Sequence, residues 1–202
     1  MPSTASGLGI ASFPASTDAP VTRTQMIVPT TVIATCVVFA LAAFLFVITG
    51  LMPANADAKP GKLEHWAAHR SLNVTIARET KALHGPATST DSVMTLGVRL
   101  YKANCLVCHG AADAKRSSVA DGLYQEPPQF AKDDVTDDPI EMTYWKITHG
   151  IRFTGMPSYK KTLTDDQRWA IAAFLRHQDS LPPTALAAWK ALPSVADSAT
   201  GR

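Results

Sequence analysis

The chain has 202 residues, of which 18% are charged, and its formal net charge at pH 7 is +2. This length is enough for one domain of ordinary size with additional segments. The near-balance of charge argues against a nucleic-acid-binding protein, which would carry an excess of basic residues on one face. Three cysteines are too few for a disulfide-stabilised scaffold, so that class is excluded as well.

The first segment, residues 1–25, is rich in Ser, Thr, Ala and Pro and is expected to be disordered, because it has too few large apolar residues to bury a core. Residues 26–52 follow and contain no charged residue. Roughly 20 apolar residues cross a bilayer as a helix, whereas the apolar part of a secretory signal has roughly 7–15. Residues 26–52 are therefore predicted to be a transmembrane anchor in contact with membrane lipid.

Two features complicate this anchor. Ala54-Asn55-Ala56 resembles the small-residue pattern of a signal-cleavage site, so cleavage after the apolar stretch remains an alternative. Arg23 precedes the stretch and Lys59 and Lys62 follow it, so the distribution of positive charge gives only a weak orientation, which leans toward placing the second half of the chain inside.

Residues 53–90 are predicted to form a linker that contains an amphipathic helix over 62–83. We expect its large apolar residues to share one broad face: Leu63, Trp66, Leu72, Ile76 and Leu83. His65 and His69 stand one turn apart, which is a spacing that metal ligands use. No third ligand is evident, and we interpret them as a solvated pair.

Residues 91–181 are predicted to form a compact helical domain, followed by a C-terminal extension over 182–202. No segment alternates convincingly between apolar and polar residues, so we expect an all-α fold. The expected elements are a helix running to Asn104, an irregular region over 110–138, and helices over 139–150, 164–178 and 184–192.

Capping residues support these helices. Asp91 or Ser92 is expected to be the N-cap of the helix that runs to Asn104, and Thr164 that of the helix over 164–178. Pro139 and Gly150 stand at the start and just past the end of the helix between them, which is the usual asymmetry of helix termini.

The motif Cys105-Leu106-Val107-Cys108-His109 carries the chemistry of the chain. A structural zinc site would need further ligands, and the sequence has no second cysteine pair. A redox dithiol is expected beside a strand–helix–strand pattern, which is absent. C-x-x-C-H is typical of haem c attachment, in which two thiols form thioethers and the following His ligates the iron. We therefore predict one covalent haem c, with Cys105 and Cys108 as its attachment points and His109 as an iron ligand.

Met156 is the predicted second iron ligand. It lies between Gly155 and Pro157 in a loop between two predicted helices, where a methionine has no helical core to fill. His149 stands near the same loop and is the alternative ligand.

Several marks in this order resemble the class I c-type cytochromes, a small all-helical monohaem family, over roughly residues 91–180. Gly97 and Tyr101 match the family's first helix, and Ile171 and Phe174 match the positions on the last helix against which they pack. The resemblance predicts a class I cytochrome c fold around one covalently bound haem, preceded here by a single transmembrane helix.

The segment Pro128-Gln129-Phe130 resembles the family's Pro-x-Leu, whose proline carbonyl accepts the second N–H of the proximal imidazole. The preceding Pro127 leaves open which of the two prolines supplies that carbonyl. We further expect Tyr124, Trp145 and Arg152 to hydrogen-bond the haem propionates. The residues expected to surround the macrocycle are Leu100, Leu106, Phe130, Trp145, Ile147 and Phe153.

The resemblance implies a function in single-electron transfer and no enzymatic activity of its own. Haem c is attached on the outer side of an energy-transducing membrane, which implies a bacterial inner membrane with residues 1–25 in the cytoplasm and the haem domain in the periplasm. The expected partners are redox proteins that belong to a membrane electron-transfer complex. Two alternatives remain: a fixed haem subunit of a larger respiratory or photosynthetic oxidoreductase, and a gas sensor or small peroxidase with a labile distal position.

Overall fold

The computed structural model describes residues 23–51, 53–86, 89–133 and 135–196. The chain divides into two compact units, one ending at Pro53 and the other beginning at Ala54. The expectation of disorder for residues 1–25 falls almost entirely outside the described residues.

The first unit contains one helix, α1 (Arg23–Ile48). Its Thr30–Ile48 segment is long and apolar enough to cross a membrane, and none of it is buried inside the structure. This is the segment that the sequence predicts as an anchor, and a signal sequence near an N-terminus can pass the same test of length and apolar composition.

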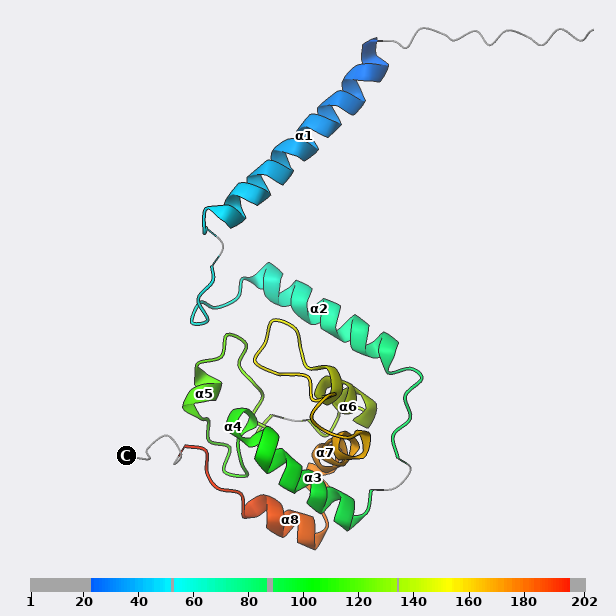
Figure 1. The fold of residues 1–202 in the computed structure, drawn as a ribbon, viewed down its shortest axis with the longest axis vertical. Helices are drawn as coiled ribbons and strands as arrows, with labels where there is room; N and C mark the ends of the chain where they lie inside the picture. The colour runs from blue at the N-terminus through cyan, green and yellow to red at the C-terminus, as the bar shows by residue number, and fades with distance from the viewer. Residues whose placement is uncertain (1–22, 52, 87–88, 134, 197–202) are drawn as a thin grey trace, which may run out of the picture. The chain divides into compact units, whose positions relative to one another are not determined.

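The second unit is all-helical in the part of the chain that the structure describes, as predicted (Figure 1). Its helices are short and are joined by irregular loops. They are α2 (Lys62–Glu79), α3 (Asp91–Asn104), α4 (Leu106–His109), α5 (Ser118–Asp121), α6 (Ile140–His149), α7 (Asp165–Arg176), the 3₁₀ helix η1 (Gln178–Ser180) and α8 (Pro183–Lys190).

The ends of these helices follow from local sequence. Thr164 caps α7 and forms a reciprocal capping box with Gln167, as the sequence predicts for Thr164. The N-cap of α3 is Thr90, whose side chain accepts a hydrogen bond from Val93 N, so the expectation of Asp91 or Ser92 was wrong by one or two positions. Thr90 is the N-cap because its hydroxyl reaches the backbone of the first turn, whereas the Asp91 side chain forms its hydrogen bonds with other residues.

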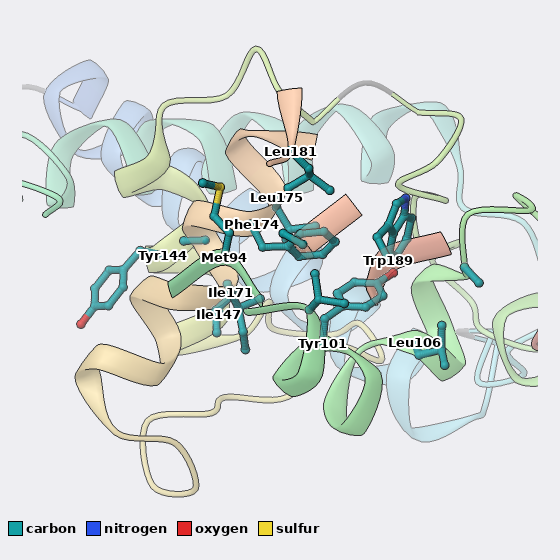
Figure 2. Close-up of a cluster of buried hydrophobic side chains, with 14 of the residues drawn as sticks. Met94, Tyr101, Leu106, Tyr144, Ile147, Ile171, Phe174, Leu175, Leu181 and Trp189 are labelled. Carbon is teal, nitrogen blue, oxygen red and sulfur yellow. The ribbon is translucent and has the colours of Figure 1, made fainter. Parts of the chain in front are cut away.

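The core forms where α3 crosses α7. A Cβ added at Gly97 would lie 2.2 Å from Ala170 O and 2.8 Å from Phe174 Cβ, so only glycine permits this approach of the two helices. Tyr101, Ile171 and Phe174 are fully buried beside the crossing (Figure 2). The family-like pairing of these positions is therefore present in the fold.

Helix α8 belongs to this core. Ala185 and Trp189 are buried, and the Trp189 ring lies edge-on to Tyr101 with 5.6 Å between ring centroids. Ala185 N also donates to Asp91 Oδ1 at the start of α3 (3.2 Å). The segment that the sequence assigns to a C-terminal extension from residue 182 thus supplies part of the packing of the haem-motif helices.

Helix α2 lies against α6, on the opposite side of the unit from α8 (Figure 1). Ile76 is buried and Leu72 is half-buried on its inner face. Leu63 and Trp66 are exposed instead, so the expectation of one broad apolar face was wrong. The reason is geometric: at 100° per residue, Leu63 and Trp66 point away from the side that carries Leu72 and Ile76.

Candidate haem-binding site

The C-x-x-C-H motif occupies a single helical turn. Cys105 ends α3, with its N–H donating to Tyr101 O (2.8 Å), and the same residue begins α4. His109 N donates back to Cys105 O (3.0 Å), so α4 holds both cysteines and the histidine in one short turn. Gly110 then ends α4 with φ of 76°, a left-handed conformation that favours glycine.

The His109 ring is oriented by the segment that the resemblance singled out. His109 Nδ1 lies 2.9 Å from Pro128 O, so Nδ1 carries the proton and donates it, and Nε2 is left as the acceptor nitrogen. Phe130 stacks on the imidazole with 4.2 Å between centroids and 7° between planes. The choice between Pro127 and Pro128, which the sequence left open, is thus resolved in favour of Pro128.

Burial lowers the pKa of His109, and the bond to Pro128 opposes that effect. The neutral imidazole is the form that ligates a metal. The geometry of the ring and its protonation state both suit an iron ligand at Nε2.

Gln129 is a supporting residue that sequence reasoning missed. Its buried side chain donates to Cys108 O (2.9 Å) and to Pro127 O (3.2 Å), which joins the motif to the proline segment. A Cβ at Gly110 would lie 2.5 Å from Gln129 Oε1, so Gly110 makes room for this side chain. A polar residue between Pro128 and Phe130 carries no local signal of such a role.

The environment of the two thiols does not suit a redox dithiol. Burial, with a smaller contribution from Cys108, raises the pKa of Cys105 to about 12, and burial also raises the pKa of Cys108. Reactive dithiols need a lowered thiol pKa. Among the described residues, moreover, no group of three or more His, Cys, Asp or Glu side chains is arranged to hold a metal ion.

The loop that carries Met156 is closed by its own backbone. Ile151 N donates to Met156 O (3.1 Å), and a Cβ at Gly150 would lie 2.7 Å from the same oxygen, so the positive φ of Gly150 permits the loop to return. Tyr159 OH donates to Asn104 O (2.7 Å), the carbonyl that directly precedes Cys105. No sequence pattern predicts this link, which ties the Met156 loop to the cysteine motif across 55 positions.

The two candidates for the second ligand differ in burial. Met156 is half-buried and packs against the hydrophobic core, whereas His149 is exposed and lies beside Trp145, with 4.9 Å between ring centroids. This difference favours Met156.

The residues expected around the macrocycle differ in how far they are buried. Five of them are buried or half-buried in the core: Leu100, Leu106, Phe130, Trp145 and Ile147. Phe153 is 88% exposed, and its place in the apolar wall stays a prediction. Its φ of 62° in the turn closed by Thr154 N and Ile151 O directs the ring outward.

The three predicted propionate donors have other surroundings in the structure. Tyr124 OH donates to Glu64 Oε1 (2.5 Å), and Trp145 Nε1 donates to Glu79 Oε2 (2.9 Å), so both donors hold carboxylates of α2. Arg152 is exposed in the Met156 loop. Their roles toward a propionate stay predictions. The two α2 carboxylates were not expected, because their partners are 60 and 66 positions away.

Comparison with known proteins points the same way. The family model described as cytochrome c oxidase, cbb3-type, subunit III matches residues 92–175. Thiosulfate dehydrogenase of Allochromatium vinosum is 30% identical over 110 residues, which are 54% of this chain and 36% of that protein. The chain therefore spans only about a third of the length of this curated relative. No solved structure matches the chain.

The helical fold, the C-x-x-C-H turn and the oriented imidazole are those of a c-type cytochrome domain. More particularly, residues 92–175 match a cytochrome c domain that binds haem c covalently, and the sequence has one such motif. The donor set fits this group, because two thiols, a neutral imidazole with a fixed tautomer and a thioether are all present in the domain.

Proposed function

We propose that this protein is a membrane-tethered electron carrier. Cys105 and Cys108 hold its one haem c through thioethers, and His109 and Met156 ligate the iron. The observation that carries the proposal is the hydrogen bond from His109 Nδ1 to Pro128 O, because it leaves Nε2 as the nitrogen available to ligate an iron. Bound haem c supplies a one-electron couple between ferric and ferrous iron.

The chain's own residues set the conditions for that couple. The Pro128 carbonyl raises the basicity of His109, and the stacked Phe130 ring holds the imidazole plane. A thioether ligand from Met156 favours the ferrous state. Burial of Leu106 and Ile147 beside the site excludes water and lowers the local dielectric, which disfavours the extra positive charge of ferric iron.

The proposed location follows from attachment chemistry and from α1. Residues 26–52 anchor the chain in a bacterial inner membrane, residues 1–25 lie in the cytoplasm, and the haem domain of residues 91–181 lies in the periplasm. Support for the anchor comes from the length and apolar composition of Thr30–Ile48. A tether confines the carrier near membrane partners and raises its effective concentration there.

Replacement of Met156 tests the ligand assignment. In Met156→Ala we expect the methionine–iron charge-transfer band of the oxidised protein to disappear and the reduction potential to fall, because the thioether is lost. His149→Ala is the matched control and should keep both properties. If the oxidised wild-type protein lacks this band, or if the band survives in Met156→Ala, the assignment of Met156 is wrong.

A second form of this function is a fixed haem subunit of a larger membrane oxidoreductase. Two observations favour it: the matching family is described as an oxidase subunit, and the curated relative is named as a dehydrogenase. Extraction in mild detergent separates the two forms. A subunit should elute with its partners, whereas elution of the chain alone contradicts this form and supports a free carrier.

A further inference from the structure

The outer face of α2 is an exposed apolar surface with no partner among the described residues of its own domain. Leu63, Trp66 and Val74 are 76%, 63% and 45% exposed. At 100° per residue, these three side chains share one side of α2 with Ala67 and Arg70. The opposite side carries Leu72 and Ile76, which face the domain, so α2 has two apolar faces.

Charge is divided between the two sides of α2. Both acidic residues of the helix are turned to the domain, where Glu64 accepts from Tyr124 and Glu79 accepts from Trp145. Arg70 is exposed among the outward apolar residues, Arg78 borders them and pairs with Glu79 (3.2 Å), and Lys62 begins the helix. The face that remains free is therefore apolar and basic, which is complementary to an anionic surface.

The composition of this face is that of an interfacial helix. Trp and Arg are favoured where a helix lies between apolar chains and polar headgroups. Residues 49–61 connect α1 to α2, and an extended chain spans roughly 3.3 Å per residue, so the connection reaches no more than about 45 Å. If α1 spans a bilayer, α2 cannot move farther than that from its surface.

We propose that the outer face of α2 (Leu63, Trp66, Ala67, Arg70 and Val74, with Lys62 and Arg78 at its borders) lies on the anionic lipid surface of the membrane. This proposal rests on the proposed anchor. The apolar face is small, but a tethered helix needs little affinity, because a short flexible connection gives an effective concentration of about a millimolar.

Docking of α2 on lipid would fix the orientation of the haem domain relative to the membrane. Since α2 contacts α6, and its Glu64 and Glu79 carboxylates accept from Tyr124 and Trp145 of the domain, the domain follows the helix. The side that carries α2 then faces the membrane, and the side that carries α8 faces away from it (Figure 1).

Spin labels on the full-length haem protein test this arrangement. The protein is placed in nanodiscs of phosphatidylcholine with phosphatidylglycerol, in a Cys36→Ala background, with a nitroxide at Ala67→Cys or, as the matched control, at Ala187→Cys on α8. Both alanines are exposed. We expect the Ala67 label to be reached by oxygen in preference to an aqueous nickel chelate, and the Ala187 label to show the reverse.

Charge and lipid composition sharpen the test. Each basic residue near an anionic surface changes association about fivefold, so Arg70→Gln should lower the docked fraction relative to the undocked by about that factor. Lys190→Gln on α8 should leave it unchanged. Discs of phosphatidylcholine alone should also lower the docked fraction, as Arg70→Gln does.

The remaining outcomes distinguish failure of lipid docking from failure of the proposed anchor and carrier function. Retention of the chain in the discs with an intact haem spectrum and a fully aqueous Ala67 label would overturn lipid docking and leave the carrier function standing. Shielding of the Ala67 label from both reagents would mean that protein covers this face of α2, and this result would also overturn lipid docking. Loss of the chain from the discs would overturn the anchor and the docking together.

Discussion

Two helix attachments in the haem domain differ in kind. At the crossing of α3 and α7, backbone meets backbone, because Gly97 leaves no room for a Cβ beside Ala170 O. At the attachment of α2, the described contacts are made by side chains: Leu72 and Ile76 in the middle, and a hydrogen bond to a carboxylate near each end. We therefore expect α2 to detach while the remaining helices stay packed, whereas partial opening of the crossing is not expected.

This difference separates global from local stability. Residues in the crossing are shared by α3, α7 and α8, so a change there affects the whole cooperative unit. The energy of the α2 attachment sets only the free energy of local opening. Substitutions in the two places should therefore produce different patterns of loss.

The largest expected effect comes from Gly97→Val. Its Cβ would overlap Ala170 O, and the helices would have to separate along their length, which costs upward of about 3 kcal/mol. Urea unfolding, followed by helical circular dichroism, should show a much lower midpoint or no folded state. Gly122→Ala is the control, because its Cβ would meet Ser118 O at 3.4 Å, an ordinary contact. Equal losses in both variants would contradict the close crossing.

Ile76→Ala should release α2 and leave the domain folded. Burial of this side chain is worth about 2–4 kcal/mol in a core, but the loss here is capped by the whole free energy of the α2 attachment. Hydrogen exchange of residues 62–79 should accelerate strongly, while exchange in α3 and α7 should not. Acceleration in α3 of the same size would show that α2 and the core are one cooperative unit.

Tyr101→Phe should cost about 1–2 kcal/mol of global stability, because the buried Gly110 carbonyl loses the hydroxyl that bonds it at 2.7 Å. Tyr159→Phe removes a similar bond to Asn104 O and is the comparison outside the crossing. We expect Tyr101→Phe to lower the urea midpoint and Tyr159→Phe to act mainly on exchange in the Met156 loop. The reverse pattern would contradict this division.

Local sequence patterns predicted the motif turn and the N-cap at Thr164, because each depends on residues close together in the chain. The spacing of Gly97 and Tyr101 places them on one side of α3. The partner of that side, the helix of Ile171 and Phe174, was predicted from the resemblance to class I cytochromes, and the structure has the close approach at Gly97.

The attachment of α2 was beyond such patterns. A helix with apolar residues on two sides gives the same composition as a helix with one broad face, and only the angles of Leu63 and Trp66 against Ile76 separate the two. The bonds from Tyr124 and Trp145 to Glu64 and Glu79 join residues about 60 positions apart. Nothing in a single sequence pairs them, and the donors were assigned to propionates instead.

The smallest expected effect is the most informative about the attachment of α2. The bond from Trp145, together with Arg78, lowers the pKa of Glu79. A carboxyl group with a lowered folded-state pKa adds stability above its unfolded pKa of about 4.3 and loses it as pH falls through the folded value. The α2 attachment should therefore weaken only in acid, below the ordinary range of a glutamate.

The indole N–H resonance of Trp145 in the reduced protein measures this titration directly. It should shift with a midpoint below about 4.3, and the shift should vanish in Glu79→Gln, which keeps an acceptor but cannot ionise. Glu64→Gln is the control at the other end of α2 and should leave the Trp145 titration in place. If Trp145 still titrates in Glu79→Gln, its indole is held by another acid, and the predicted bond to a haem propionate becomes the better assignment. The same resonance thus decides whether Trp145 serves the attachment of α2 or the haem.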